Sequence, residues 1–178
     1  MIRMKIYRVD KRSFKEGDTI KPNCKFEEGL YGEKAELEAM LNNLRAPGIP
    51  ERSKCLFLFQ DLAGALRYMA KYGGIIYSVF PNKVFYRGDM NKLDNILDVF
   101  RFTSDENLRT DVVNEYWKPG THTYNPCYEI LTDQAEVASV ICGEDIQARI
   151  KEELITMGNC IERCPIYFEL IKKLYPNI

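Results

Sequence analysis

The sequence predicts an α+β protein, because short apolar strands and amphipathic helices are mixed along it without regular strand–helix–strand alternation. Its 178 residues are 46% hydrophobic and 12% aromatic, which is enough to build one substantial core. The net charge is only -1, so a globally disordered chain is excluded. We therefore predict a single domain over residues 1–178, with a helical segment over residues 143–178.

Residues 4–74 are predicted to form a strand, a helix, a second strand and a second helix. Met4–Val9 is predicted to be a strand because it alternates and contains β-branched and aromatic residues, and the loop Lys15–Ile20 follows it. Cys55–Phe59 is predicted to be a buried strand because it is a short apolar run. A helix between these strands is predicted by apolar residues at helical spacing, which are Leu37, Met40, Leu41 and Leu44. Asp61 is a suitable N-cap for the next helix, which buries Leu62, Leu66 and Met69 and ends at Gly73-Gly74.

Two strand pairs are predicted further along. Ile75–Phe80 and Lys83–Arg87 are separated by Pro81-Asn82, as in a hairpin with a short irregular loop. Cys127–Thr132 and Ala135–Ile141 form the second expected pair.

Helices fill the rest of the sequence. Asp89 is expected to cap one helix, and a second, from Asp105 to Trp117, is expected to bury Leu108, Val112 and Tyr116. Two more helices are predicted near the C-terminus, one from Asp145 onward and one over Pro165–Leu174.

Composition excludes several functional classes. No apolar run is long enough to span a membrane, and the N-terminus reaches charged residues without an apolar signal block, so a cytoplasmic protein is expected. The 25 Lys and Arg against 26 Asp and Glu disfavour nucleic-acid binding by bulk charge. Without a signal peptide, the six cysteines are expected to be free thiols, and Cys160 with Cys164 is too small a set for a zinc site, so no metal is expected.

Two charged residues interrupt apolar strands. Arg8 lies in Ile6-Tyr7-Arg8-Val9, and Glu129 lies in Cys127-Tyr128-Glu129-Ile130-Leu131. A charge in such a strand either faces water on a half-exposed sheet or is held in a cleft by partners, and the sequence leaves both interpretations open.

Together with a third short motif, these residues resemble the ADP-ribosyltransferase superfamily, in the branch whose active site has an arginine, a serine and a glutamate on three strands. Ile6–Asp10 matches the arginine strand, and Gly17–Ile20 matches the G-D-x-I pattern after it. Arg52-Ser53-Lys54 precedes the second strand, and Tyr128–Leu131 matches the glutamate strand. The likeness spans about residues 5–141 by order and spacing.

The resemblance implies a split β-sheet core with flanking helices and an NAD-dependent mono-ADP-ribosyltransferase that modifies a protein acceptor. It implies Glu129 as the catalytic residue, because a carboxylate beside the ribose stabilises the positive charge that develops as the bond to nicotinamide breaks. Arg8 would bind the pyrophosphate or adenosine ribose of NAD, and Ser53 would fix Glu129 or the nicotinamide ribose. Tyr68 and Tyr77 are candidates to flank the nicotinamide, with ordinary packing as the alternative for both.

The sequence departs from the family pattern at two places. Cys127 stands where arginine-modifying members carry Glu or Gln, so arginine is not implied as the acceptor. Ser53 lacks the usual Ser-Thr-Ser setting, so its assignment rests on the least of the three motifs. Arg87 is a lower-ranked competitor for the role of Arg8. A catalytically inactive ADP-ribosyltransferase-like module that binds a protein partner is the alternative function. Removal of a 2′-phosphate from RNA is disfavoured by the balanced charge.

Overall fold

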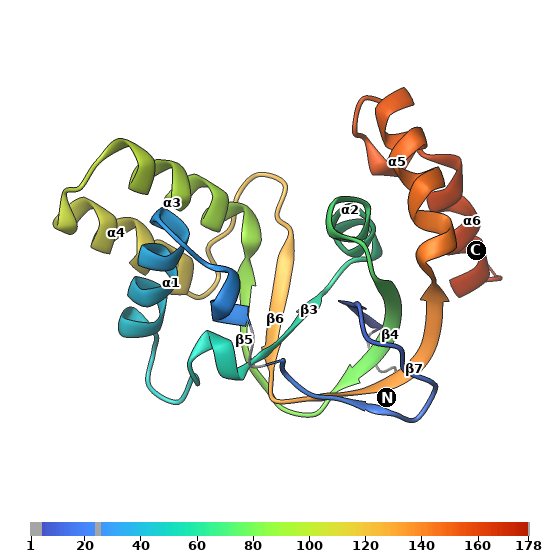
Figure 1. Ribbon diagram of the computed structural model, residues 1–178, viewed down its shortest axis with the longest axis horizontal. Coiled ribbons are helices and arrows are strands. Elements are labelled where there is room, and N and C mark those ends of the chain that lie inside the picture. Colours follow the sequence, from blue (N-terminus) through green and yellow to red (C-terminus); the bar gives the residue numbers. More distant parts are fainter. Residues whose placement is uncertain (1–4, 24–25, 178) are drawn as a thin grey trace. The chain divides into compact units, whose positions relative to one another are not determined.

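A computed structural model describes residues 5–23 and 26–177, and its elements confirm the α+β class (Figure 1). Six α-helices and seven strands lie in these described ranges, while the expected strand residue Met4 and the cysteine Cys24 lie outside them. The chain divides into two compact units. The first is built from Met1–Thr19, Phe59–Phe80 and Glu136–Ile178, and the second from Ile20–Leu58 and Pro81–Ala135. A single domain over the whole chain stays a prediction.

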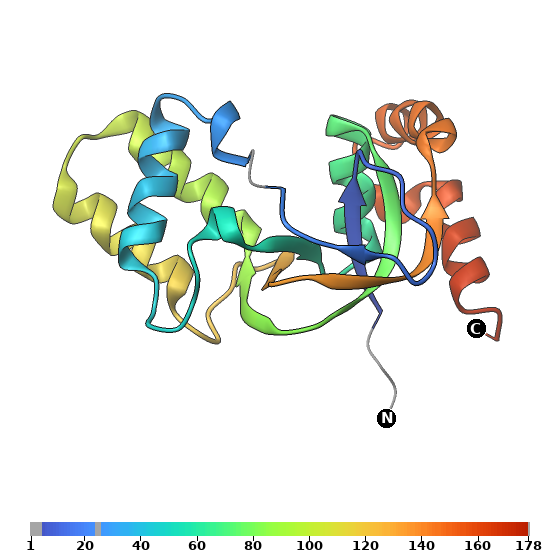
Figure 2. The same cartoon turned by 60° about the horizontal axis from the view of Figure 1, so that its bottom comes forward.

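The strands of the first unit hydrogen-bond in the order β2-β7-β4-β1. They are β1 (Ile6–Asp10), β2 (Thr19–Ile20), β4 (Ile75–Pro81) and β7 (Ala135–Cys142). β1 runs antiparallel to β4 with Tyr7 opposite Ser78, and Tyr7 also faces Phe59. Helix α2 (Leu62–Tyr72) packs against β1 (Figure 2). All of β1 except Arg8 is buried, so Arg8 is the residue of this strand that reaches the surface.

The C-terminal part of the first unit is helical. Helix α5 (Gln147–Thr156) follows a 3-10 turn, η3 (Glu144–Ile146), so the helix expected from Asp145 becomes α-helical only after that turn. A second 3-10 turn, η4 (Ile161–Arg163), leads to α6 (Pro165–Leu174), which has its proline in the first turn as expected. Both helices bury residues four positions apart, namely Ile150 with Leu154 and Ile166 with Leu170.

The second unit combines three helices with the strand order β3-β6-β5. Its strands are β3 (Leu56–Phe59), whose last residue belongs to the first unit, β5 (Val84–Asp89) and β6 (Tyr128–Thr132). Its helices are α1 (Glu33–Leu44), α3 (Met90–Phe102) and α4 (Glu106–Trp117), and its 3-10 turns are η1 (Phe26–Gly29) and η2 (Arg52–Lys54). The helices pack on one another around a core that includes Leu41, Phe100, Trp117 and Leu131. In the described part of the chain, no helix has the length and apolar character needed to cross a bilayer.

Both predicted strand pairs are wrong. β5 pairs antiparallel with β6, and β4 pairs with β1. The short connection after β4 and the short connection after β6 hydrogen-bond to each other. Asp133 accepts hydrogen bonds from the Lys83 backbone and the Asn82 side chain, and the Asn82 backbone donates to the Gln134 carbonyl. A turn-forming sequence fixes where the chain bends, but it does not fix which strand pairs with the next one.

The prediction that α4 buries Leu108 is also wrong. Leu108 is 45% exposed, and Val112 is only half-buried. The buried face of α4 is formed by Val113, Tyr116 and Trp117, because residues three and four apart share one side of a helix. The expected loop Lys15–Ile20 likewise contains a short strand, β2, next to β7.

Candidate functional site

Glu129 lies at the centre of a buried ionic cluster in the second unit. The carboxylate is carried by β6, and the residue is 3% exposed. Its Oε1 accepts hydrogen bonds from Arg52 Nη1 at 3.0 Å and from the Tyr116 hydroxyl at 2.5 Å. Arg52 Nη1 also donates to the Tyr116 hydroxyl at 2.8 Å, and Arg52 Nε donates to Glu38 Oε1 at 2.9 Å. Glu38, Arg52, Tyr116 and Glu129 are called the Glu129 cluster below.

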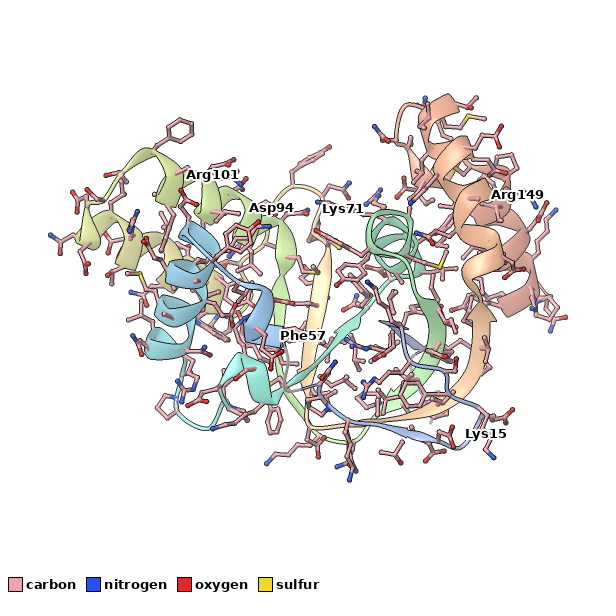
Figure 3. All side chains as sticks on the ribbon, viewed as in Figure 1. Lys15, Phe57, Lys71, Asp94, Arg101 and Arg149 are labelled. Carbon is pink, nitrogen blue, oxygen red and sulfur yellow. The ribbon has the colours of Figure 1, made fainter. Side chains whose placement is uncertain are left out.

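Each member of the Glu129 cluster comes from a different element, namely α1, η2, α4 and β6. The turn η2 is fixed from outside the cluster, because Asn42 Oδ1 accepts a 2.8 Å hydrogen bond from the Arg52 backbone. The Arg52 guanidinium also lies over the ring of Phe57 at 4.9 Å and over that of Tyr116 at 5.5 Å. Figure 3 labels Phe57 among the side chains of this unit. Arg52 is therefore held by both ionic and aromatic partners.

The electrostatics of the cluster keep Arg52 charged and Tyr116 protonated. Burial alone would lower the pKa of Arg52, but the charge of Glu129, the largest of the opposing causes, raises this pKa above its usual range, and Glu38 adds to the effect. Burial, reinforced by the Glu129 carboxylate, raises the pKa of Tyr116 well above its usual value. Tyr116 therefore remains a hydrogen-bond donor to Oε1 at neutral pH.

The second carboxylate oxygen of Glu129 is the open position of the cluster. Within the described ranges, none of the hydrogen bonds of Glu129 reaches Oε2, and no side-chain nitrogen or oxygen is both buried and without a hydrogen-bond partner. Oε2 therefore touches accessible space although the residue as a whole is buried. The same reasoning applies to Arg52 Nη2. The cluster thus has one acceptor, Glu129 Oε2, and one donor, Arg52 Nη2, that make none of its hydrogen bonds.

The sequence matches no protein-family model, and no curated protein matches it. What these residues do must be inferred from their chemistry.

Ser53, the expected partner of Glu129, lies beside the cluster in sequence but is not among its hydrogen-bonded members. It is half-buried in η2 and precedes β3. Its neighbour Arg52 makes the contact with Glu129 instead. Sequence reasoning missed Arg52, Glu38 and the hydroxyl of Tyr116. The available signal was the charged segment Arg52-Ser53-Lys54, which precedes a buried strand.

Arg8 belongs to a second ionic group, which lies in the first unit. Its Nε and Nη2 donate to Asp10 Oδ2 at 3.0 and 2.9 Å, and its side chain is 18% exposed. Arg12 donates to the same carboxylate from its backbone and from its guanidinium. Burial alone would raise the pKa of Asp10, but hydrogen bonds from Arg12 and the charge of Arg8 lower it to about 2. Two guanidinium groups are thus fixed around one buried carboxylate.

The two predicted tyrosines differ in exposure. Tyr68 on α2 is 39% exposed and lies against Phe59 and Tyr72, with ring centroids 5.2 and 4.6 Å away. Tyr77 on β4 is 1% exposed, and its hydroxyl accepts from the Phe14 backbone and donates to the Arg12 carbonyl. Tyr77 therefore anchors the segment after β1, and a contact between Tyr77 and nicotinamide stays a prediction.

Asp89 fixes the segment that leads into β6. Its carboxylate caps α3 by accepting from the Asn91 backbone, as expected. It also accepts from the backbone and hydroxyl of Thr123 at 2.7 and 2.6 Å and from the backbone of Cys127 at 3.0 Å. Burial would raise the pKa of Asp89, but these hydrogen bonds lower it. The start of the glutamate strand is thus tied to a helix N-terminus.

Proposed function

We propose that the chain is an NAD-dependent mono-ADP-ribosyltransferase that modifies a protein acceptor and releases nicotinamide. One observation carries the proposal: Glu129 is a buried carboxylate whose Oε1 is held by Arg52 and Tyr116 while Oε2 remains open. The order of the arginine, serine and glutamate motifs along the sequence supports the same reaction.

The open oxygen suits the charge change of this reaction. When the bond between nicotinamide and the ribose breaks, its electron pair leaves with nicotinamide and positive charge develops on the sugar. Oε2 would accept a hydrogen bond from a ribose hydroxyl and stabilise that charge. The acceptor nucleophile then forms the new bond to the ribose carbon and loses its proton, which Glu129 could take. Arg52 and Tyr116 would fix the carboxylate, so little reorganisation is needed.

Of the remaining predicted residues, only Ser53 lies in the same unit as Glu129, and it would contact the nicotinamide ribose. Arg8, Tyr68 and Tyr77 lie in the first unit, so the proposal assigns them no contact at Glu129. Binding of the pyrophosphate by Arg8 and flanking of the nicotinamide by Tyr68 or Tyr77 stay predictions from the resemblance.

The test is nicotinamide release from NAD, with and without a cell lysate as the source of acceptor protein. Glu129→Gln keeps the shape of the side chain and removes its charge, so we expect at least a hundredfold loss of turnover with little change in NAD affinity by calorimetry. Glu136→Gln is the matched control, because Glu136 is an exposed glutamate on a strand. Wild-type turnover in Glu129→Gln would refute the catalytic role of Glu129.

The alternative is an inactive protein-binding module, and one observation favours it. Glu129 already has two strong partners, so its burial can be explained by the stability of the second unit alone. In that case wild-type protein would show no NAD binding by calorimetry and no nicotinamide release. Glu129→Gln would then change the free energy of unfolding and nothing else.

A further inference from the structure

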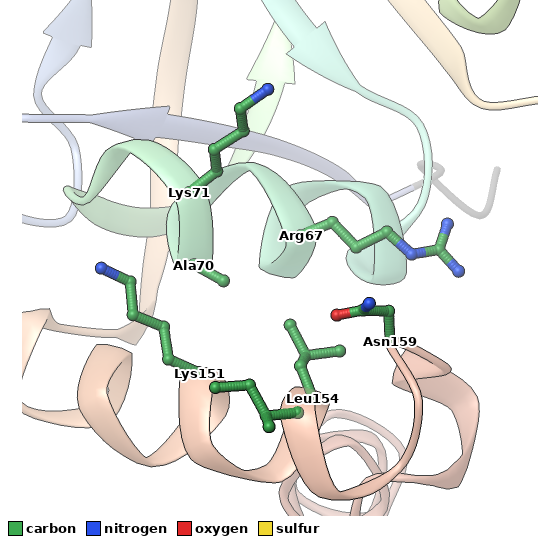
Figure 4. A pocket seen from close by; sticks show the side chains of 7 residues that line it. Arg67, Ala70, Lys71, Lys151, Leu154 and Asn159 are labelled. Carbon is green, nitrogen blue, oxygen red and sulfur yellow. The ribbon is translucent and has the colours of Figure 1, made fainter.

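The first unit contains a groove between α2 and α5 that lies outside the residues of the proposed reaction (Figure 4). Its volume is about 370 Å³, within the range of binding pockets. Its lining includes Arg67, Ala70 and Lys71 from α2 and Lys151, Leu154 and Ile155 from α5.

The floor of the groove is apolar. Ala70 and Leu154 are buried where the two helices pack, and Figure 4 shows their side chains facing into the space between the helices. Ile155, beside Leu154, is 79% exposed. A large aliphatic side chain open to water at the edge of an apolar groove is a contact point for an apolar group of a partner.

The rim of the groove is basic. Arg67 and Lys71 are four residues apart on α2, so they share one side of that helix, and Lys151 adds a third cation from α5. Among the described lining residues there is no acidic side chain, although the whole chain has a net charge of only -1. In Figure 4 the Lys151 ammonium and the Arg67 guanidinium lie at opposite ends, with Ala70 and Leu154 between them.

A carboxylate already occupies one end of this rim. Glu162 accepts hydrogen bonds from Arg67 Nη2 at 3.0 and 3.3 Å, and both side chains are exposed. An exposed ion pair contributes little free energy, so a carboxylate from another molecule can exchange with Glu162 at little cost. Lys151 has no ion-pair partner among the residues that the structure describes.

We propose that this groove docks an acidic amphipathic segment of a partner protein. Apolar side chains of the segment would lie on Ala70, Leu154 and Ile155, and flanking carboxylates would pair with Lys151 at one end and Arg67 at the other. The alternation of cation, apolar floor and cation selects a peptide with acidic residues on both sides of an apolar pair. The docking does not depend on the proposed transferase activity.

Nuclear magnetic resonance titration of the full chain tests the docking. The probe is a short synthetic peptide with two leucines flanked by glutamates, and the control probe has lysines in place of the glutamates. We expect saturable shifts of the backbone amides of Ala70, Lys151 and Ile155 with the acidic peptide only, and a weaker affinity as salt is added.

Variants at exposed positions distinguish the groove from general charge attraction. Lys151→Glu and Ile155→Ser should each raise the dissociation constant of the acidic peptide about fivefold or more. Lys172→Glu makes the same charge change on an exposed lysine of α6 outside the groove and should leave the dissociation constant unchanged.

Three outcomes would overturn the docking proposal. The first is an absence of saturable shifts at the groove. The second is equal binding of the lysine peptide. The third is equal displacement of the acidic peptide by inorganic phosphate or by anionic lipid vesicles, which would indicate an unspecific anion-binding surface.

Discussion

The Tyr116 hydroxyl donates a 2.5 Å hydrogen bond to Glu129 Oε1, and both residues are buried. Hydrogen bonds to charged acceptors are shorter and stronger than those between neutral groups. Since Arg52 also donates to both residues, the three side chains form a closed triangle. The consequences of this triangle for stability can be measured apart from any catalytic role.

Tyr116→Phe should lower the free energy of unfolding by about 1 to 3 kcal/mol, because it removes one of the two donors to a buried carboxylate. Urea unfolding followed by circular dichroism measures this change. Tyr31→Phe, at an exposed tyrosine, is the control and should change nothing. A Tyr116→Phe protein as stable as the wild type would show that this hydrogen bond contributes no net stability.

Arg52→Met should cost more, about 3 to 5 kcal/mol, because it removes the cation that pairs with the buried carboxylate of Glu129 and also with that of Glu38. Adding Glu38→Gln and Glu129→Gln to the same protein should restore part of the loss, since the uncompensated charges are then removed. Both steps are read from the midpoint of urea unfolding.

The control for Arg52→Met is Arg101→Met, which breaks only the exposed pair with Asp98 and should change stability by about 0.5 kcal/mol or less. If the triple variant were less stable than Arg52→Met alone, uncompensated charge would not be the cause of the loss.

Asp10 should make stability depend on pH in the acid range. Its folded pKa of about 2 is below the usual value of 3.8, so its contribution is fully present above about pH 4 and is lost as the pH falls through 2. The shift corresponds to a contribution on the order of 2 kcal/mol.

Urea unfolding at a series of pH values measures this dependence. Asp10→Asn should be less stable than the wild type at neutral pH, and the difference between the two should shrink as the pH falls from 4 to 2. A constant difference over that range would contradict the assigned role of Asp10.

Asp89→Ala should loosen the segment before β6, because one carboxylate holds the amides of Thr123 and Cys127 as well as the start of α3. We expect faster hydrogen exchange at those two amides and easier proteolysis between them. Asp105→Ala is the matched control, since Asp105 caps α4 through Asn107 and Leu108.

Asp105→Ala should cost about 1 kcal/mol of stability without any effect on exchange near Thr123. Equal exchange at Thr123 in the wild type and in Asp89→Ala would show that the segment is held by other contacts.

Local sequence predicted the elements far better than their partners. Apolar spacing and caps such as Asp89 located the helices, because these signals act within a few residues. Strand pairing depends on contacts between distant residues, and for this reason β5 pairs with β6 rather than with β4, against the turn signal at Pro81-Asn82. The prediction that Leu108 is buried was wrong for a related reason, because packing against distant residues determines which side of α4 is buried.

The candidate site was predictable at its centre and not at its edges. A carboxylate in an apolar strand marked Glu129, and the structure buries it among partners. Arg52 and Glu38 gave no comparable pattern, since a charged residue in a turn or on an amphipathic helix is ordinarily solvated. Only the three-dimensional arrangement of α1, η2 and β6 brings their charges together.

The interleaving of the two units along the chain sets an order for folding during synthesis. All stretches of the second unit have left the ribosome once Ala135 has emerged, whereas the first unit still lacks its last stretch, Glu136–Ile178. The second unit, with the Glu129 cluster inside it, can therefore form while β1 and α2 still await β7 and the C-terminal helices. No single cut in the gene would yield either unit as one continuous polypeptide, so separate production of a unit requires joining its stretches by new linkers.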